Sequence, residues 1–175
     1  FGTNGFYLPF SNDVLAASFT DSATGKSVSV YGNSHTDTAI KKVGSASAQF
    51  DGGGDYLAVG DAGFKLGNTS ASWTIEFWVY ISSVGADYII MDHRANTQNN
   101  GGFSFYTDVS TGGVGFDRSN GTTWTGGIQD PVQNTVDTWY HWVITFAGDT
   151  PFFPSNLVKK LYNQAKIKNK KIILA

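Results

Sequence analysis

The chain has 175 residues with 15% aromatic residues, 21 glycines and only 15% charged residues, a composition typical of one β-rich domain with many tight turns. The absence of cysteine excludes disulfides, cysteine-based metal sites and thiol nucleophiles. The net charge of −2 is divided unevenly: residues 1–150 hold fourteen acidic and six basic residues, a net −8, whereas residues 151–175 hold six lysines and no acid. An acidic body argues against nucleic acid as a partner, and no apolar run reaches the roughly 20 residues of a membrane span.

The first sixty residues predict short strands separated by turns. Residues 6–10 are expected to form an edge strand, because Pro9 cannot donate a backbone hydrogen bond to a neighbour. Residues 46–50 and 56–59 flank a glycine-rich loop, so we expect the two segments to pair as a hairpin. Further strands are expected over 27–31 and, from a weaker pattern, over 38–40.

The two strongest strand patterns cover residues 73–81 and 139–146. Both are aromatic and β-branched, and neither contains glycine or proline. Because strand side chains alternate, each segment has two distinct faces. We expect both to be central strands, lying in two facing antiparallel layers. In the first, Ile75, Phe77, Val79 and Ile81 share one face, and Thr74, Glu76, Trp78 and Tyr80 the other. In the second, one face holds Tyr140, Trp142, Ile144 and Phe146, and the other face holds Trp139, His141, Val143 and Thr145.

Four shorter strands are expected between these two segments, separated by glycine- and asparagine-rich turns. Their regular spacing indicates an antiparallel sandwich or jelly roll, an all-β fold. No helix is predicted before residue 150. The four segments are 88–91, 103–106, 113–116 and 122–125.

The last 25 residues differ in kind from the rest, so we divide the chain into a domain over 1–150 and a lysine-rich tail over 151–175. One interpretation is an amphipathic helix that begins near Ser155, followed by a short strand over 172–174. The other is that the tail does not belong to the natural reading frame of the domain. A basic helix lying on a membrane surface is a weaker third interpretation.

Three segments carry a family resemblance. Residues 49–57 (QFDGGGDYL) resemble the F-D-G-x-x-D-Y segment of laminin-G-like, concanavalin A-like jelly-roll domains. Residues 72–80 (SWTIEFWVY) and 138–146 (TWYHWVITF) resemble two long strands of the same family, in the same order and at the same spacing. The resemblance covers roughly residues 40–148 and implies a jelly-roll fold.

Two further features concern the ends of the domain. Residues 2–8 resemble a segment that precedes such domains in tail and other structural proteins of bacteriophages. After Gly148 and Asp149 the family pattern stops, so the sandwich is expected to lack closing strands unless the tail or a second chain supplies them. An unclosed sheet leaves edges that favour association, and a homo-oligomer is therefore possible.

The superfamily includes glucanases, which makes catalysis the first hypothesis to test. These enzymes carry E-x-D-x-x-E on one strand, whereas this chain has a single glutamate, Glu76, with Trp78 two positions later. Asp87 and Asp92 are five residues apart and are expected to face opposite sides of a strand, which does not suit a pair of catalytic carboxylates. His93, Arg94 and Tyr88 do not form a convincing lyase set. The sequence therefore favours a non-catalytic role and leaves the question of an enzyme open.

Glu76, Trp78 and Tyr80 are the candidate ligand-binding residues. Aromatic rings stack on the apolar face of a sugar, and a neighbouring carboxylate accepts hydrogen bonds from its hydroxyl groups. The alternative, which we favour, is that the two rings are packed under loops or the other sheet.

Asp51 and Asp55 are the candidate metal ligands. Carboxylates on a flexible loop suit Ca²⁺, and the resemblance implies Ca²⁺ at the sandwich rim. The alternative, favoured because only two ligands lie close together, is that both side chains cap the backbone of their own loop. The three histidines, His35, His93 and His141, show no metal-ligand spacing.

The sequence thus predicts a non-catalytic binding or assembly module that recognises a glycan or a protein surface. Its place would be in a larger extracellular or virion protein. The alternatives are a carbohydrate-active enzyme, either hydrolase or lyase, and a purely structural domain of a phage tail or capsid.

Overall fold

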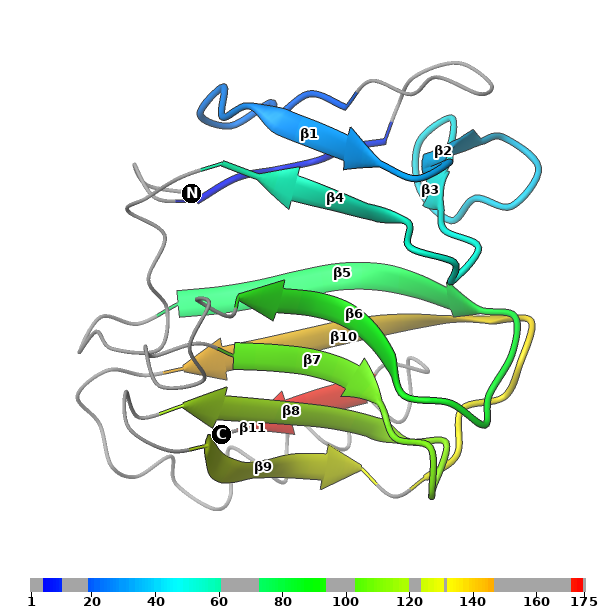
Figure 1. Ribbon diagram of the computed structural model, residues 1–175, viewed down its shortest axis with the longest axis vertical. Coiled ribbons are helices and arrows are strands. Elements are labelled where there is room, and N and C mark those ends of the chain that lie inside the picture. Colours follow the sequence, from blue (N-terminus) through cyan, green and yellow to red (C-terminus); the bar gives the residue numbers. More distant parts are fainter. Residues whose placement is uncertain are drawn as a thin grey trace. The chain divides into compact units, whose positions relative to one another are not determined.

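The structure is a computed structural model that describes residues 5–10, 19–60, 73–93, 103–119, 124–130, 132–146 and 171–174. Within these ranges every regular element is a β-strand, as the all-β prediction requires (Figure 1). The chain divides into two compact units, Phe1–Phe64 and Lys65–Ala175, which are described separately below.

The first unit is a long, interrupted hairpin. Strand β1 (Val28–Tyr31) pairs antiparallel with β4 (Tyr56–Val59), and β2 (His35–Asp37) pairs antiparallel with β3 (Ser47–Gln49). β1 and β2 therefore form one arm of the hairpin, and β3 and β4 form the other. The predicted pairing of 46–50 with 56–59 is wrong, because β3 and β4 follow each other along the same arm.

Two predicted strands of this unit are absent, and hydrogen bonds to aspartate side chains explain both. Residues 38–40 bend because the Asp37 carboxylate accepts the N–H of Ala39 at 2.6 Å, which ends β2. Residues 6–10 join no ladder. Tyr7 instead donates its N–H to Asp21 at 2.8 Å, and its carbonyl accepts the N–H of Ser22 at 2.9 Å.

Asp21 is a buried anchor of this unit, with only 3% of the residue exposed. Its carboxylate accepts backbone N–H groups from Tyr7, Ala23, Thr24 and Lys26, and the Thr24 hydroxyl at 2.7 Å. Burial raises the pKa of Asp21, but the hydrogen bonds outweigh it and hold that pKa well below its ordinary value.

The second unit holds two sheets. One is three-stranded, in the order β11 (Lys171–Leu174), β10 (Thr138–Phe146) and β5 (Trp73–Ile81). The other is four-stranded and antiparallel, in the order β6 (Tyr88–His93), β7 (Phe103–Thr107), β8 (Val114–Ser119) and β9 (Trp124–Asp130). Figure 1 shows the four-stranded sheet in front of the three-stranded one.

Aromatic rings join the two sheets. Phe77 of β5, Trp142 of β10 and Phe105 of β7 form a mutual cluster with ring centroids 5.2 to 5.7 Å apart. Trp142, Phe105 and Ile144 are fully buried. The faces predicted by alternation are confirmed, since Phe77 lies opposite Trp142 and Ile75 opposite Ile144 in the register.

The prediction that the two long strands lie in facing layers is wrong. β5 and β10 are antiparallel neighbours in one sheet, paired from Thr138 opposite Ile81 to Phe146 opposite Trp73. The layer that faces them is built from the four shorter strands. The apolar sides of both long strands therefore bury together against β7.

The tail contributes a strand to this sandwich. β11 runs parallel to β10, with Trp142 opposite Lys171 and Thr145 opposite Leu174. The short strand expected near 172–174 is thus present, and it covers one edge of β10. The helix proposed from Ser155 lies outside the described residues.

A β-bulge between Ile89 and Met91 shifts the register of β6 by one residue. After the bulge, Asp92 lies opposite Ser104 and Met91 opposite Phe105. Phe105 points into the core, so Asp92 lies on the outer side of the sheet. The expectation for Asp87 and Asp92 assumed unbroken alternation, which this bulge interrupts.

Candidate functional site

The predicted ligand-binding residues lie on the outer face of β5, opposite outward-facing residues of β10. In the register Glu76 is opposite Val143, Trp78 opposite His141, and Tyr80 opposite Trp139. Directly opposite side chains on neighbouring strands are close enough to interact. The three candidates therefore lie along one face, and Trp78 and Tyr80 have aromatic partners across the strand pair.

His141 connects two of the candidates. Its Nε2 lies 3.3 Å from Oε1 of Glu76, and its ring stacks on Trp78 with centroids 4.7 Å apart and an interplanar angle of 22°. The Glu76 side chain is 62% exposed, whereas that of His141 is 10% exposed. The buried histidine thus positions an exposed carboxylate beside an indole ring.

Tyr80 lies at the other end of the same face, where it contacts Asp137 and Trp139. Its hydroxyl donates to Oδ1 of Asp137 at 3.2 Å, and its ring lies 5.4 Å from that of Trp139. Burial, and then the hydrogen bond and negative charge of Asp137, raise the pKa of Tyr80. Tyr80 therefore stays a neutral phenol, with its ring presented next to Trp78.

Trp78 and Tyr80 are half-buried rather than fully packed away. Rings that are partly exposed beside an exposed carboxylate are suited to holding a polar ligand with an apolar face. At the Thr74 end of this face, the Thr74 and Thr145 hydroxyls form a hydrogen bond across the two strands at 3.1 Å.

The calcium candidates, Asp51 and Asp55, lie in the loop that interrupts the hairpin of the first unit. Oδ1 of Asp51 accepts the N–H of Gly53 at 2.6 Å, and Oδ2 accepts the Asn33 side chain at 3.1 Å. Asp55 accepts the N–H of Asn33 at 2.8 Å and that of Asp51 at 2.9 Å. These bonds connect the loop to the turn at Gly32, the opposite arm of the hairpin.

The hydrogen bonds from Gly53 and Asn33 hold the pKa of Asp51 below its ordinary value. Among the residues that the structure describes, no three acidic or histidine side chains come together as a metal site would require. Both carboxylates already act as backbone caps, which is the role favoured from the sequence. Calcium binding at Asp51 and Asp55 stays a prediction.

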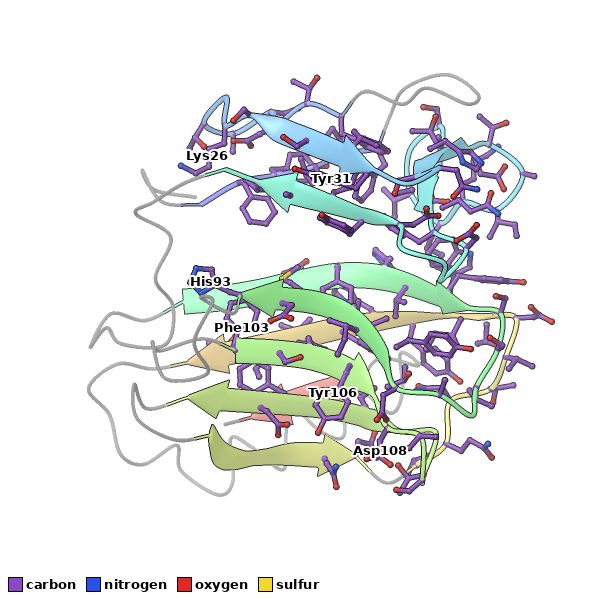
Figure 2. The ribbon with its side chains drawn as sticks, viewed as in Figure 1. Lys26, Tyr31, His93, Phe103, Tyr106 and Asp108 are labelled. Carbon is purple, nitrogen blue, oxygen red and sulfur yellow. The ribbon has the colours of Figure 1, made fainter. Side chains whose placement is uncertain are left out.

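The sequence patterns did not single out the outer face of the four-stranded sheet. Tyr106 of β7 lies over Gly115 of β8, where an added Cβ would come within 2.4 to 2.8 Å of the phenol ring and hydroxyl. The labelled Tyr106 side chain lies on the face turned to the viewer in Figure 2. Alternation alone puts Tyr106 outward, but only the strand register reveals the glycine beneath it.

Comparison with known proteins identifies the fold family. A family model for the concanavalin A-like lectin/glucanases superfamily matches residues 51–157 of the chain. The chain belongs to this superfamily. No curated protein and no solved structure gives a match.

Membership confirms the resemblance and the sandwich prediction. The superfamily holds both lectins and glucanases by its description, so it fits a binding module and leaves the specific ligand of this concanavalin A-like domain open. Within the described part of the chain no helix has the length and apolarity needed to cross a membrane.

Proposed function

We propose that this concanavalin A-like domain is a non-catalytic recognition module that binds carbohydrate through the outer face of β5 and β10. The observation that supports it is the exposed carboxylate of Glu76 beside the half-buried ring of Trp78. The superfamily, which contains lectins, supports the same class of ligand.

Recognition divides between stacking and hydrogen bonding. The apolar face of a sugar ring stacks on the exposed part of Trp78 or Tyr80. Glu76 accepts hydrogen bonds from two neighbouring hydroxyl groups, and His141 keeps the carboxylate in place from below at 3.3 Å. The charged groups of this face, Glu76 and Asp137, are carboxylates, which favours neutral over anionic glycans.

The absence of the E-x-D-x-x-E arrangement supports a binding role over a hydrolytic one. Glu76 is the only glutamate of the chain, and Trp78 and Ile81 stand where the strand would need further carboxylates. The domain would be one part of a larger surface or virion protein. The phage connection of residues 2–8 belongs to this proposal and stays a prediction.

A glycan array followed by calorimetry tests the proposal. Trp78→Ala should remove glycan binding while the melting temperature stays well above the assay temperature. Glu76→Gln should weaken binding at least about tenfold with little change in stability, because the side chain is 62% exposed. Tyr56→Ala, which removes an exposed ring of the first unit, is the matched control and should leave binding unchanged.

Other results point to the alternatives. Depolymerisation of a polysaccharide that Glu76→Gln abolishes would replace the binding role with an enzymatic one. A stable oligomer without affinity for any glycan would favour a structural role. Binding to a protein that survives Trp78→Ala would assign recognition to another surface.

A further inference from the structure

Tyr31 and Tyr56 meet across the strand pair of β1 and β4. The register puts the two residues directly opposite each other, and opposite side chains lie on the same side of a strand pair. Their ring centroids are 4.3 Å apart and their planes differ by 8°, so the two phenol rings stack face to face. Carbon atoms in van der Waals contact are about 3.5–4.0 Å apart, so a stack this close brings ring carbons of the two residues near contact.

Both rings of this stack are open to solvent. Tyr31 is 44% exposed and Tyr56 is 51% exposed. The next residues on the same side of the two strands are Ser29 and Ala58, whose side chains are small. Most stacked aromatic rings bury their surface in a core, whereas this pair presents two phenols to reagents in solution.

The backbone is fixed on both sides of the pair. Four residue pairs join β1 to β4, and just beyond them the N–H of Gly60 donates to the carbonyl of Ser27 at 3.1 Å. On the other side of the rings, the N–H of Asn33 donates to Oδ1 of Asp55 at 2.8 Å. Hydrogen bonds before and after the two tyrosines therefore keep their rings together.

Stacked phenols are suited to one oxidative reaction, the formation of dityrosine. Loss of one electron and one proton turns a phenol into a phenoxyl radical, whose unpaired electron is shared by the oxygen and the two neighbouring ring carbons, Cε1 and Cε2. These carbons react through the faces of the ring, where the π electrons lie. Two nearly parallel rings at 4.3 Å present those faces to each other, which is the approach that a carbon–carbon bond between them needs.

We propose that Tyr31 and Tyr56 are a modification site at which a peroxidase, with hydrogen peroxide as its oxidant, joins β1 covalently to β4. The peroxide takes one electron and one proton from each phenol and becomes two water molecules. The two radicals form one bond between a Cε of Tyr31 and a Cε of Tyr56. The hydrogen on each joined carbon then passes to the oxygen of its own ring as aromaticity returns, so the product has lost two hydrogen atoms.

The cross-link does for this chain what a disulfide does in other domains. The sequence has no cysteine, so no disulfide ties the arms of the interrupted hairpin together. A bond between residues 31 and 56 closes the chain between them into a loop, which restricts the unfolded state and stabilises the folded one. The site uses no residue of the face of β5 and β10 and does not depend on the proposed function.

Treatment of the full chain with a peroxidase and hydrogen peroxide tests the proposal. Trypsin cleaves after lysine, so Tyr31 and Tyr56 fall in separate peptides, 27–41 and 43–65, each of which holds one tyrosine. We expect these peptides to be joined, lighter than their sum by two hydrogen atoms, and to show the blue fluorescence of dityrosine. Dilution of the protein should leave the cross-linked fraction unchanged, because the two rings already lie together in one molecule.

Two substitutions assign the residues. Tyr56→Phe keeps an aromatic ring in the stack but has no phenol to oxidise, so the joined peptides should disappear. Tyr7→Phe is the matched control, because it removes another tyrosine of the same unit that is 48% exposed, and it should leave the joined peptides at the natural level. Oxidation should raise the melting temperature of the natural protein and of Tyr7→Phe by about 5 °C or more, and should not raise that of Tyr56→Phe.

Several results would overturn the proposal. In one, peptides 27–41 and 43–65 stay separate after oxidation, which would show that the stacked rings do not couple. In another, dityrosine appears only in dimers and declines on dilution, which would show that the reacting tyrosines belong to different molecules. Joined peptides that persist in Tyr56→Phe would assign the bond to a different residue, and an unchanged melting temperature after cross-linking would refute the stabilising role.

Discussion

Replacing Gly115 with alanine tests how Tyr106 is placed on the four-stranded sheet. The added Cβ would come 2.4 and 2.5 Å from two ring carbons of Tyr106 and 2.8 Å from its hydroxyl oxygen. Carbon atoms in contact prefer about 3.5 to 4.0 Å, so the ring has to move outward by about 1 Å. The backbone of Gly115 does not itself require glycine, because its φ is not in the left-handed region.

The cost follows from what the moving ring gives up. The forced shift disturbs the packing of Tyr106 on β8 and the interactions of its hydroxyl with Asp117 and Gln129, and overpacking of this kind costs about 1–3 kcal/mol. Alanine in a strand is more favourable than glycine by about 0.5–1 kcal/mol, which offsets part of the loss. We therefore expect Gly115→Ala to lower the free energy of unfolding by about 1 kcal/mol in the natural background. With Tyr106→Ala already present, the same change should be neutral or stabilise by about 0.5 kcal/mol.

Urea denaturation of the four proteins in this double-mutant cycle measures the coupling. The free energy of unfolding is read from the midpoint at constant slope. The contact predicts a coupling energy between Gly115 and Tyr106 of about 1–2 kcal/mol. If Gly115→Ala costs the same with and without the Tyr106 ring, the ring does not lie on the glycine and the reasoning is refuted.

Three further predictions concern the core, acid stability and metal. Trp142→Ala should destabilise by about 3–5 kcal/mol in urea, because the indole is fully buried between the sheets; a cost below 1 kcal/mol would contradict that packing. The depressed pKa of Asp21 contributes stability that is complete above its unfolded pKa of about 3.9 and is lost as pH falls below it. The melting temperature should therefore fall more steeply between about pH 5 and pH 2 in the natural protein than in Asp21→Asn, and parallel curves would contradict this. If Asp51 and Asp55 bind Ca²⁺, adding the ion should raise the melting temperature and EDTA should lower it. If neither addition changes the melting temperature, the loop does not bind Ca²⁺.

Much of the fold was predictable because strand patterns are local. The alternation in 73–81 and 139–146 indicated which side chains of β5 and β10 face inward, and Phe77 and Trp142 lie there. It also put Glu76, Trp78 and Tyr80 on one face, where the structure has them. The family resemblance indicated the sandwich that the match to 51–157 shows.

The main errors concern strand pairing and hydrogen bonds. Residues 56–59 pair with β1 rather than with β3, and β5 lies beside β10 rather than opposite it. Residues 6–10 form no strand because a buried carboxylate, that of Asp21, takes the N–H of Tyr7. A partner strand or a distant hydrogen-bond acceptor is chosen by the whole packed unit, and no short stretch of sequence records that choice.

The sequence by itself determined where most strands lie and which sides of the two long strands are apolar, since both follow from the two-residue period of an extended chain. Only the tertiary structure decided which side chains meet across strands. The bulge at Ile89 and Met91 shows why: one extra residue turns Asp92 from the core side to the outer side. That shift, set by how β6 packs on β7, brings Asp92 opposite Ser104.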